Sequence, residues 1–200
     1  MMIRYLMPCG RADIILDLLP EINYFLSMKL IEKPQPGEYA PYAIMYIGLL
    51  PDDGLVLKYL NDNLKTTKDF ILSLPKEKLT YRYAEGKWTI KEVLVHIIDD
   101  ERIYAYRALR FARNDQTELP GFEQDDYARH SNANERRIKS ILQEYTAVRQ
   151  ATMALFAGLA ENTFTKTGVA NNHLVSVRAL AYHIAGHEIH HINIIKQRYC

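Results

Sequence analysis

The sequence has few cysteines and no long apolar run, and each absence excludes a class of protein. Cys9 and Cys200 lie at opposite ends of the 200 residues, which argues against a disulfide scaffold and fits a reducing compartment. No apolar run approaches the roughly 20 residues that cross a bilayer. Asp13, Asp17 and Glu21 interrupt the apolar N-terminal stretch that a secretory signal would need. We therefore expect a cytoplasmic protein with no membrane partner.

The sequence also lacks an excess of either charge. Its 25 basic and 24 acidic residues leave a formal net charge of +1, and no basic run stands apart from acidic neighbours, so no nucleic-acid partner is expected. At 48% hydrophobic and 24% charged residues, the composition is that of an ordinary globular domain. Low-complexity tracts, clear internal repeats and convincing β-strands are also missing.

Four long amphipathic segments predict an all-α fold. Apolar residues recur at steps of three and four, the pattern of helices that pack in a bundle. Residues 114–131 are long enough to connect opposite ends of a bundle, so the second and third helices can run parallel. Residues 161–174 are expected to form a loop. The four predicted helices are residues 55–74, 89–113, 132–159 and 177–199.

The chain before these helices is expected to have two parts. We treat residues 1–32 as an N-terminal extension of uncertain status, with one short helix at about 12–28, and Met28 is an alternative start. Residues 33–54 are rich in proline and glycine, which predicts an extended arm that wraps the surface. Its expected anchors are Tyr39, Tyr42, Tyr46 and Ile47.

Histidines occupy core positions in the last predicted helix. His187 and His191 lie one turn apart on the inward stripe, where Leu or Ile is normally found. Polar rings in a core cost free energy unless something satisfies them, and a divalent metal ion would do so. His96, near the inward stripe of the second helix, is the best third ligand. His183 and His190, which lie beside the stripe, are alternatives.

Other charged residues on the second helix leave two interpretations open. Glu101 interrupts the apolar stripe, either as a solvated side chain or as a carboxylate that orients a ligand or takes a proton. Asp99 is either exposed or such an orienting group. Arg107, Arg110 and Arg113 form either a solvated face or the lining of an anionic pocket.

Residues 187–191 also match the His-Glu-x-x-His pattern of zinc metalloproteases, in which the glutamate is the general base. Those enzymes take a third ligand downstream, whereas none of the residues after His191 is Glu, Asp or His. No strand is expected to hold a peptide. The metalloprotease is therefore the weaker alternative, and Glu188 stays a candidate base.

Two segments together resemble the DinB-like family of metal-binding four-helix bundles. One is residues 85–107, with Lys87-Trp88-Thr89 before His96, and the other is residues 182–191. The resemblance spans about residues 33–199. It implies an up-down-down-up bundle, often a homodimer, with a metal ion on His96, His187 and His191. Zinc or nickel is the expected ion, while iron, manganese and cobalt also accept histidine.

The resemblance implies a metal-dependent enzyme that acts on a small molecule. Relatives in this family include S-transferases that use bacillithiol or mycothiol, a maleylpyruvate isomerase and candidate metal-dependent hydrolases. We expect a transferase, in particular a thiol S-transferase, or a hydrolase, and the substrate side then includes a low-molecular-weight thiol. The alternative is a bundle in which the metal only stabilises the fold.

Overall fold

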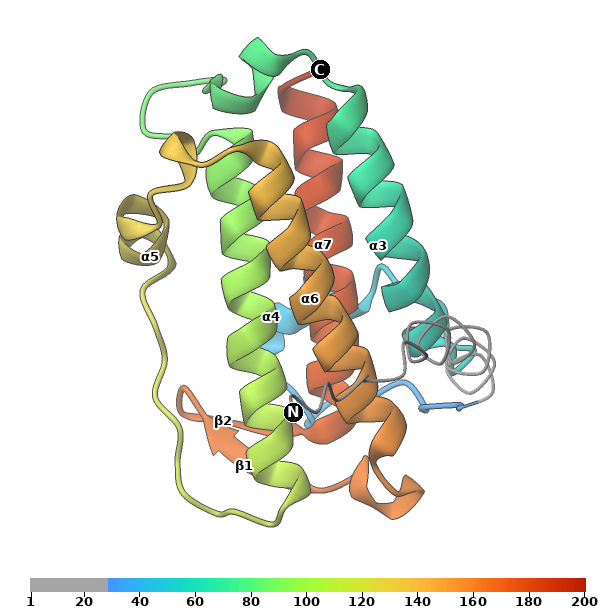
Figure 1. Cartoon of the computed structure of the whole chain (residues 1–200). Helices are drawn as coiled ribbons and strands as arrows, with labels where there is room; N and C mark the ends of the chain where they lie inside the picture. Colours follow the sequence, from blue (N-terminus) through green and yellow to red (C-terminus); the bar gives the residue numbers. More distant parts are fainter. Residues whose placement is uncertain (1–28) are drawn as a thin grey trace, which may run out of the picture.

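The structure is a computed structural model that describes residues 29–200, so the short helix expected at 12–28 lies outside the described residues. Within residues 29–200, four long helices lie side by side (Figure 1). Two of them ascend in this view and two descend, in the order up, down, down, up, which confirms the predicted bundle. They are α3 (Val56–Ser73), α4 (Ile90–Ala112), α6 (Ile138–Gly158) and α7 (Val177–Arg198).

Each long helix touches two others, and this arrangement positions the site. Helix α4 packs against both α6 and α7, and α3 packs against the same two helices. The segment between α4 and α6 returns from one end of the bundle to the other (Figure 1). It carries the short helix α5 (Gln124–His130) and the turn η3 (Ala133–Glu135). As predicted, α4 and α6 therefore run parallel.

Side-chain caps fix where two of these helices begin. The Thr89 hydroxyl accepts a hydrogen bond from the Glu92 backbone at 3.2 Å, and the Glu92 carboxylate accepts one from the Thr89 backbone at 2.7 Å. This reciprocal pair is a capping box, which fixes the start of α4. Ser176 caps α7 in the same way, accepting from the Ala179 backbone at 3.1 Å.

The predicted start of the third helix, at residue 132, is wrong by six residues. Asn132 has a left-handed backbone with φ 52°, and Arg136 and Arg137 are extended. A residue with positive φ cannot continue a right-handed helix. The chain therefore makes only the single turn η3 before α6 begins at Ile138.

The expectation of no strands is also wrong. Residues 161–174 were expected to form a loop, but the antiparallel strands β1 (Thr167–Ala170) and β2 (His173–Ser176) form a hairpin. Asn171 and Asn172 make the turn with φ 50° and 62°. Asparagine tolerates this conformation, and two such residues in succession are typical of a tight hairpin turn. The strands are too short for periodicity to reveal them.

The N-terminal arm is more helical than expected. It contains two short turns, η1 (Pro41–Ala43) and α2 (Ile44–Ile47). Of the expected anchors, Ile47 is fully buried whereas Tyr42 is exposed. Gly186 lets this arm approach α7, because a Cβ there would lie 2.2 Å from the Tyr46 carbonyl oxygen. The approach brings the Tyr46 ring over the histidines of α7.

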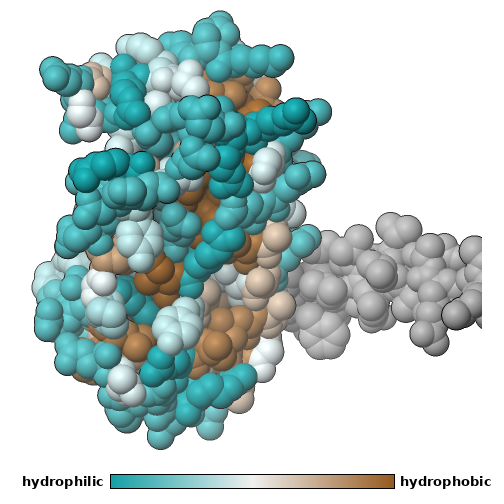
Figure 2. All heavy atoms as spheres, turned by 60° about the vertical axis from the view of Figure 1, so that its left-hand side comes forward, coloured by the Kyte–Doolittle hydropathy of each residue, from teal (hydrophilic) through white to brown (hydrophobic). Residues whose placement is uncertain are grey.

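The surface is mixed in character. Hydrophilic residues cover most of the face in Figure 2, with apolar residues visible between them. None of the helices in residues 29–200 combines the length and the apolar character that a membrane span needs.

Candidate metal centre

Three imidazole rings meet where α4 crosses α7. Their ligand-capable nitrogen atoms all lie within 4.8 Å of one another. The Nε2 atom of His187 is 3.0 Å from Nε2 of His96 and 3.1 Å from Nε2 of His191. The structure thus brings together the three residues that the sequence singled out. We call them the histidine triad.

Burial keeps the triad neutral. It lowers the pKa of His96, lowers the pKa of His187 further, and lowers the pKa of His191 to about 3. A neutral imidazole offers the lone pair that a metal ion needs. Imidazole nitrogens that share one zinc ion at about 2.0–2.1 Å lie roughly 3–3.5 Å apart. The triad therefore fits a divalent ion in charge state, and the two nitrogen–nitrogen distances at His187 match this spacing.

Asp100 lies behind the triad, and sequence reasoning missed it. Its Oδ2 atom is 3.4 Å from Nδ1 of His187 and 3.4 Å from Nε2 of His183. Burial alone would raise the pKa of Asp100, but the adjacent His187 and His183 rings lower it to about 2. A charged carboxylate at Nδ1 favours the ring orientation and tautomer that direct the Nε2 lone pair of His187 into the triad.

A signal for Asp100 was present in the sequence. It follows His96 by four residues and therefore shares that face of α4. Asp99 was singled out instead, but its carboxylate lies 3.5 Å from the exposed guanidinium of Arg102. Within residues 29–200, Oδ2 of Asp100 and Nε2 of His183 are buried without a hydrogen bond.

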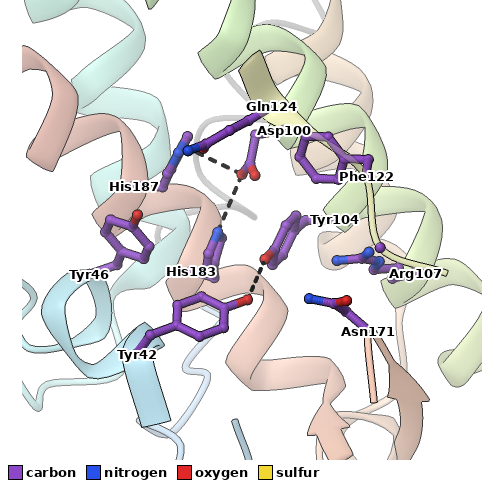
Figure 3. Close-up of a pocket in the computed structure, with 11 residues that line it drawn as sticks. Tyr42, Tyr46, Asp100, Tyr104, Arg107, Phe122, Gln124, Asn171, His183 and His187 are labelled. Atoms are coloured by element: carbon purple, nitrogen blue, oxygen red, sulfur yellow. Dashed lines mark hydrogen bonds and ion pairs between the residues drawn. The ribbon is translucent and has the colours of Figure 1, made fainter. Parts of the chain in front are cut away.

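A cavity of about 250 Å³ adjoins the triad on the Asp100 side of His187. Figure 3 shows Tyr46 and His187 on one side, Arg107 and Asn171 on the other, and His183 and Tyr104 between them. The His183 ring stacks on Tyr104 with centroids 3.7 Å apart. The full lining is Tyr42, Tyr46, Asp100, Tyr104, Arg107, Gly121, Phe122, Gln124, Asn171, His183 and His187.

Glu101 and Glu188 lie in a different buried cluster. The guanidinium of Arg149 donates to Glu101 at 2.9 Å from both Nε and Nη2, and Nη2 also donates to Glu188 at 2.7 Å. Glu188 accepts further hydrogen bonds from Tyr145 and, at 2.6 Å, from Thr67. Neither glutamate lines the cavity. We call these five side chains the arginine cluster.

Residues 59–195 match the family model of the DinB superfamily. The chain belongs to this superfamily. A relative from Oceanobacillus iheyensis is 28% identical over 142 residues, which cover 70% of this chain and 81% of that protein. YfiT from Bacillus subtilis superposes with a TM-score of 0.65 at 16% identity, covering 86% of this chain and 94% of that one. Both are described as candidate metal-dependent hydrolases, and YfiT has an unusual four-helix bundle topology.

The other histidines of this DinB-superfamily chain lie outside the triad. His183 faces the cavity, and His190 lies edge-on to Tyr46 with ring centroids 5.2 Å apart. His130 is the last residue of α5 and His173 the first of β2, within the two segments that the sequence presented as connections. Of the arginine series, Arg107 lines the cavity, whereas Arg110 pairs with Asp115.

Proposed function

We propose that this protein is a metal-dependent hydrolase that acts on a small molecule. The observation that carries the proposal is the convergence of three neutral imidazoles, two buried and one partly buried, at Nε2 distances of 3.0 and 3.1 Å. His96, His187 and His191 would hold the ion. The descriptions of the two relatives support the same activity. The cavity of about 250 Å³ beside the triad suits a small molecule better than a peptide.

Zinc or nickel is the ion that we propose first, although iron, manganese and cobalt also accept three histidines. A divalent ion supplies a Lewis acid that polarises the substrate and lowers the pKa of a water molecule. The protein's own contribution is to hold the site. Asp100 orients the His187 ring, and Tyr46 covers His183 and His187 with ring centroids 5.0 and 5.2 Å away.

We assign Glu101 and Glu188 a structural role. Both carboxylates are held by Arg149 and are almost completely buried. A general base must reach the proton that it removes, and a carboxylate that already bonds Arg149, Tyr145 and Thr67 is poorly placed to do so. The metalloprotease alternative needs Glu188 as its base, so this geometry supports the small-molecule hydrolase instead.

Metal content tests the proposal directly. We expect the purified wild type to hold close to one equivalent of a divalent metal by elemental analysis and His187→Ala to lose it. His190→Ala is the matched control, because it removes a neighbouring imidazole outside the triad, and it should keep the metal. Full metal content in His187→Ala would overturn the assignment of the ligands.

Activity separates the remaining alternatives. We expect the metal-loaded protein to hydrolyse chromogenic esters or amides of small acids, and a chelator to abolish this. Faster release of the leaving alcohol or amine with added bacillithiol or cysteine, with the acyl group recovered as a thioester of that thiol, would point to S-transfer. A cobalt-substituted protein with four protein ligands and no exchangeable water would support a purely structural metal.

The homodimer and the cytoplasmic location stay predictions. Sedimentation analysis measures the oligomeric state.

A further inference from the structure

Arg107 is a buried cation for which residues 29–200 supply no carboxylate partner. It is 5% exposed, and its one hydrogen bond within these residues runs from Nη2 to the Pro120 carbonyl oxygen at 2.8 Å. Arg149 and Arg178, the other buried arginines of the described chain, each pair with two glutamates. Buried charges are normally paired. Arg107 is therefore an exception, because no carboxylate of residues 29–200 balances its charge.

The guanidinium of Arg107 lines the cavity beside the triad. It lies over the Tyr104 ring, 5.0 Å from the centroid. Figure 3 shows the amide of Asn171 and the hydroxyl groups of Tyr42 and Tyr104 around the same part of the cavity. Amide and hydroxyl groups donate hydrogen bonds to an anion, and a guanidinium presents a planar fork that matches a carboxylate.

The charges along the cavity wall restrict what the ligand can be. The carboxyl group of Asp100 lies seven residues before Arg107 on α4, roughly 10 Å along the helix axis. One guanidinium balances a single negative charge, and no second Arg or Lys of residues 29–200 lines the cavity. This favours a monoanionic carboxylate over a phosphate dianion.

We propose that Arg107 binds the carboxylate of a small ligand whose other end extends along α4 toward His187. That this ligand is the substrate rests on the proposed function, whereas the binding of the carboxylate does not. Arg107 is then a binding residue that fixes one end of the molecule and leaves the other end beside His187.

Calorimetric titration of the metal-loaded protein with phenylacetate, 4-phenylbutyrate, their amides and phenyl phosphate tests the proposal. We expect the carboxylates to bind saturably, and more tightly than the amides and the phosphate. Arg107→Gln should weaken carboxylate binding at least about tenfold, and Arg107→Lys should fall between the two. Arg113→Gln, which removes an exposed arginine next to the end of the same helix, should change the Kd less than about twofold.

Two results would overturn the proposal. One is equal carboxylate affinity in the wild type and in a folded Arg107→Gln or Arg107→Lys protein. The other is a wild type that fails to bind the carboxylates, or that prefers phenyl phosphate. The same titration on His187→Ala separates this inference from the hydrolase. Carboxylate binding there, together with a wild type that holds no metal and hydrolyses nothing, would keep the role of Arg107 and remove the proposed function.

Discussion

Two buried polar clusters flank helix α7, and they differ in whether the protein itself satisfies them. In the arginine cluster, Arg149 bonds both glutamates and the Leu60 carbonyl oxygen, and Thr67 and Tyr145 complete Glu188. In the cluster around the triad, Oδ2 of Asp100 and Nε2 of His183 lack hydrogen bonds within the described chain. A buried polar group without a hydrogen bond costs free energy, so the protein satisfies the second cluster less completely than the first.

Neighbouring residues supply opposite clusters. Asp100 and Glu101 are consecutive on α4, and His187 and Glu188 are consecutive on α7. Successive residues of a helix point about 100° apart, so one member of each pair joins the triad side and the other joins the arginine cluster. Helices α4 and α7 therefore each contribute one residue of the pair to the triad side and the other to the arginine cluster.

Removing Arg149 from the arginine cluster should destabilise the protein more than any other change considered below. Arg149→Met leaves two buried carboxylates without a cation and should lower the free energy of unfolding by about 3–5 kcal/mol. Urea denaturation measures it. Arg102→Met, which removes an exposed arginine that pairs with Glu144, should cost no more than about 1 kcal/mol. An equal loss in the free energy of unfolding in the two variants would show that the arginine cluster stabilises the bundle no more than a surface ion pair does.

Asp100→Asn should weaken metal binding and leave the protein folded. It removes the charge at Nδ1 of His187 and should lower the metal affinity about 10–100-fold. Competition with a chromophoric chelator measures the affinity. Asp99→Asn changes the adjacent carboxylate, which faces Arg102, and should bind metal like the wild type. The role of Asp100 fails if both variants keep wild-type affinity.

Acid should weaken the fold of protein stripped of metal. Burial lowers the pKa of His191 to about 3, whereas a histidine in an unfolded chain titrates near about 6.5. Below about pH 6.5 the unfolded chain takes up a proton that the folded chain does not, so stability is lost as the pH falls. Between about pH 7 and about pH 5, this group should cost about 2 kcal/mol.

Urea denaturation at both pH values measures this loss. His191→Gln removes the titrating ring and should lose about 2 kcal/mol less than the wild type over the same interval. An identical pH dependence in the two proteins would mean that His191 is protonated equally well in the folded and the unfolded chain.

Helix periodicity predicted the bundle and the triad, because both depend on positions that repeat along one helix face. It failed where a partner on another helix decides which residue points inward. On α6 the apolar periodicity favours Val148 for the inward face, but Val148 is only partly buried and the adjacent Arg149 is completely buried. Arg149 is inside because two acids from α4 and α7 converge on it, and one sequence does not show that convergence. Asp100 is a different case, because its four-residue spacing from His96 did place it on the same face of α4.

Glu188→Gln tests whether Glu188 has a structural role or acts as a general base. Glu188→Gln keeps the shape of the side chain and leaves Arg149 paired with Glu101. If Glu188 belongs only to the arginine cluster, metal content and the rate of hydrolysis per folded molecule should stay within about twofold of wild type. A general base contributes about 10²–10⁴-fold to the rate, so the His-Glu-x-x-His interpretation demands a loss of at least about 100-fold. Steady-state rates on the same chromogenic ester, corrected for the folded fraction by circular dichroism, decide between a brace and a base at this position.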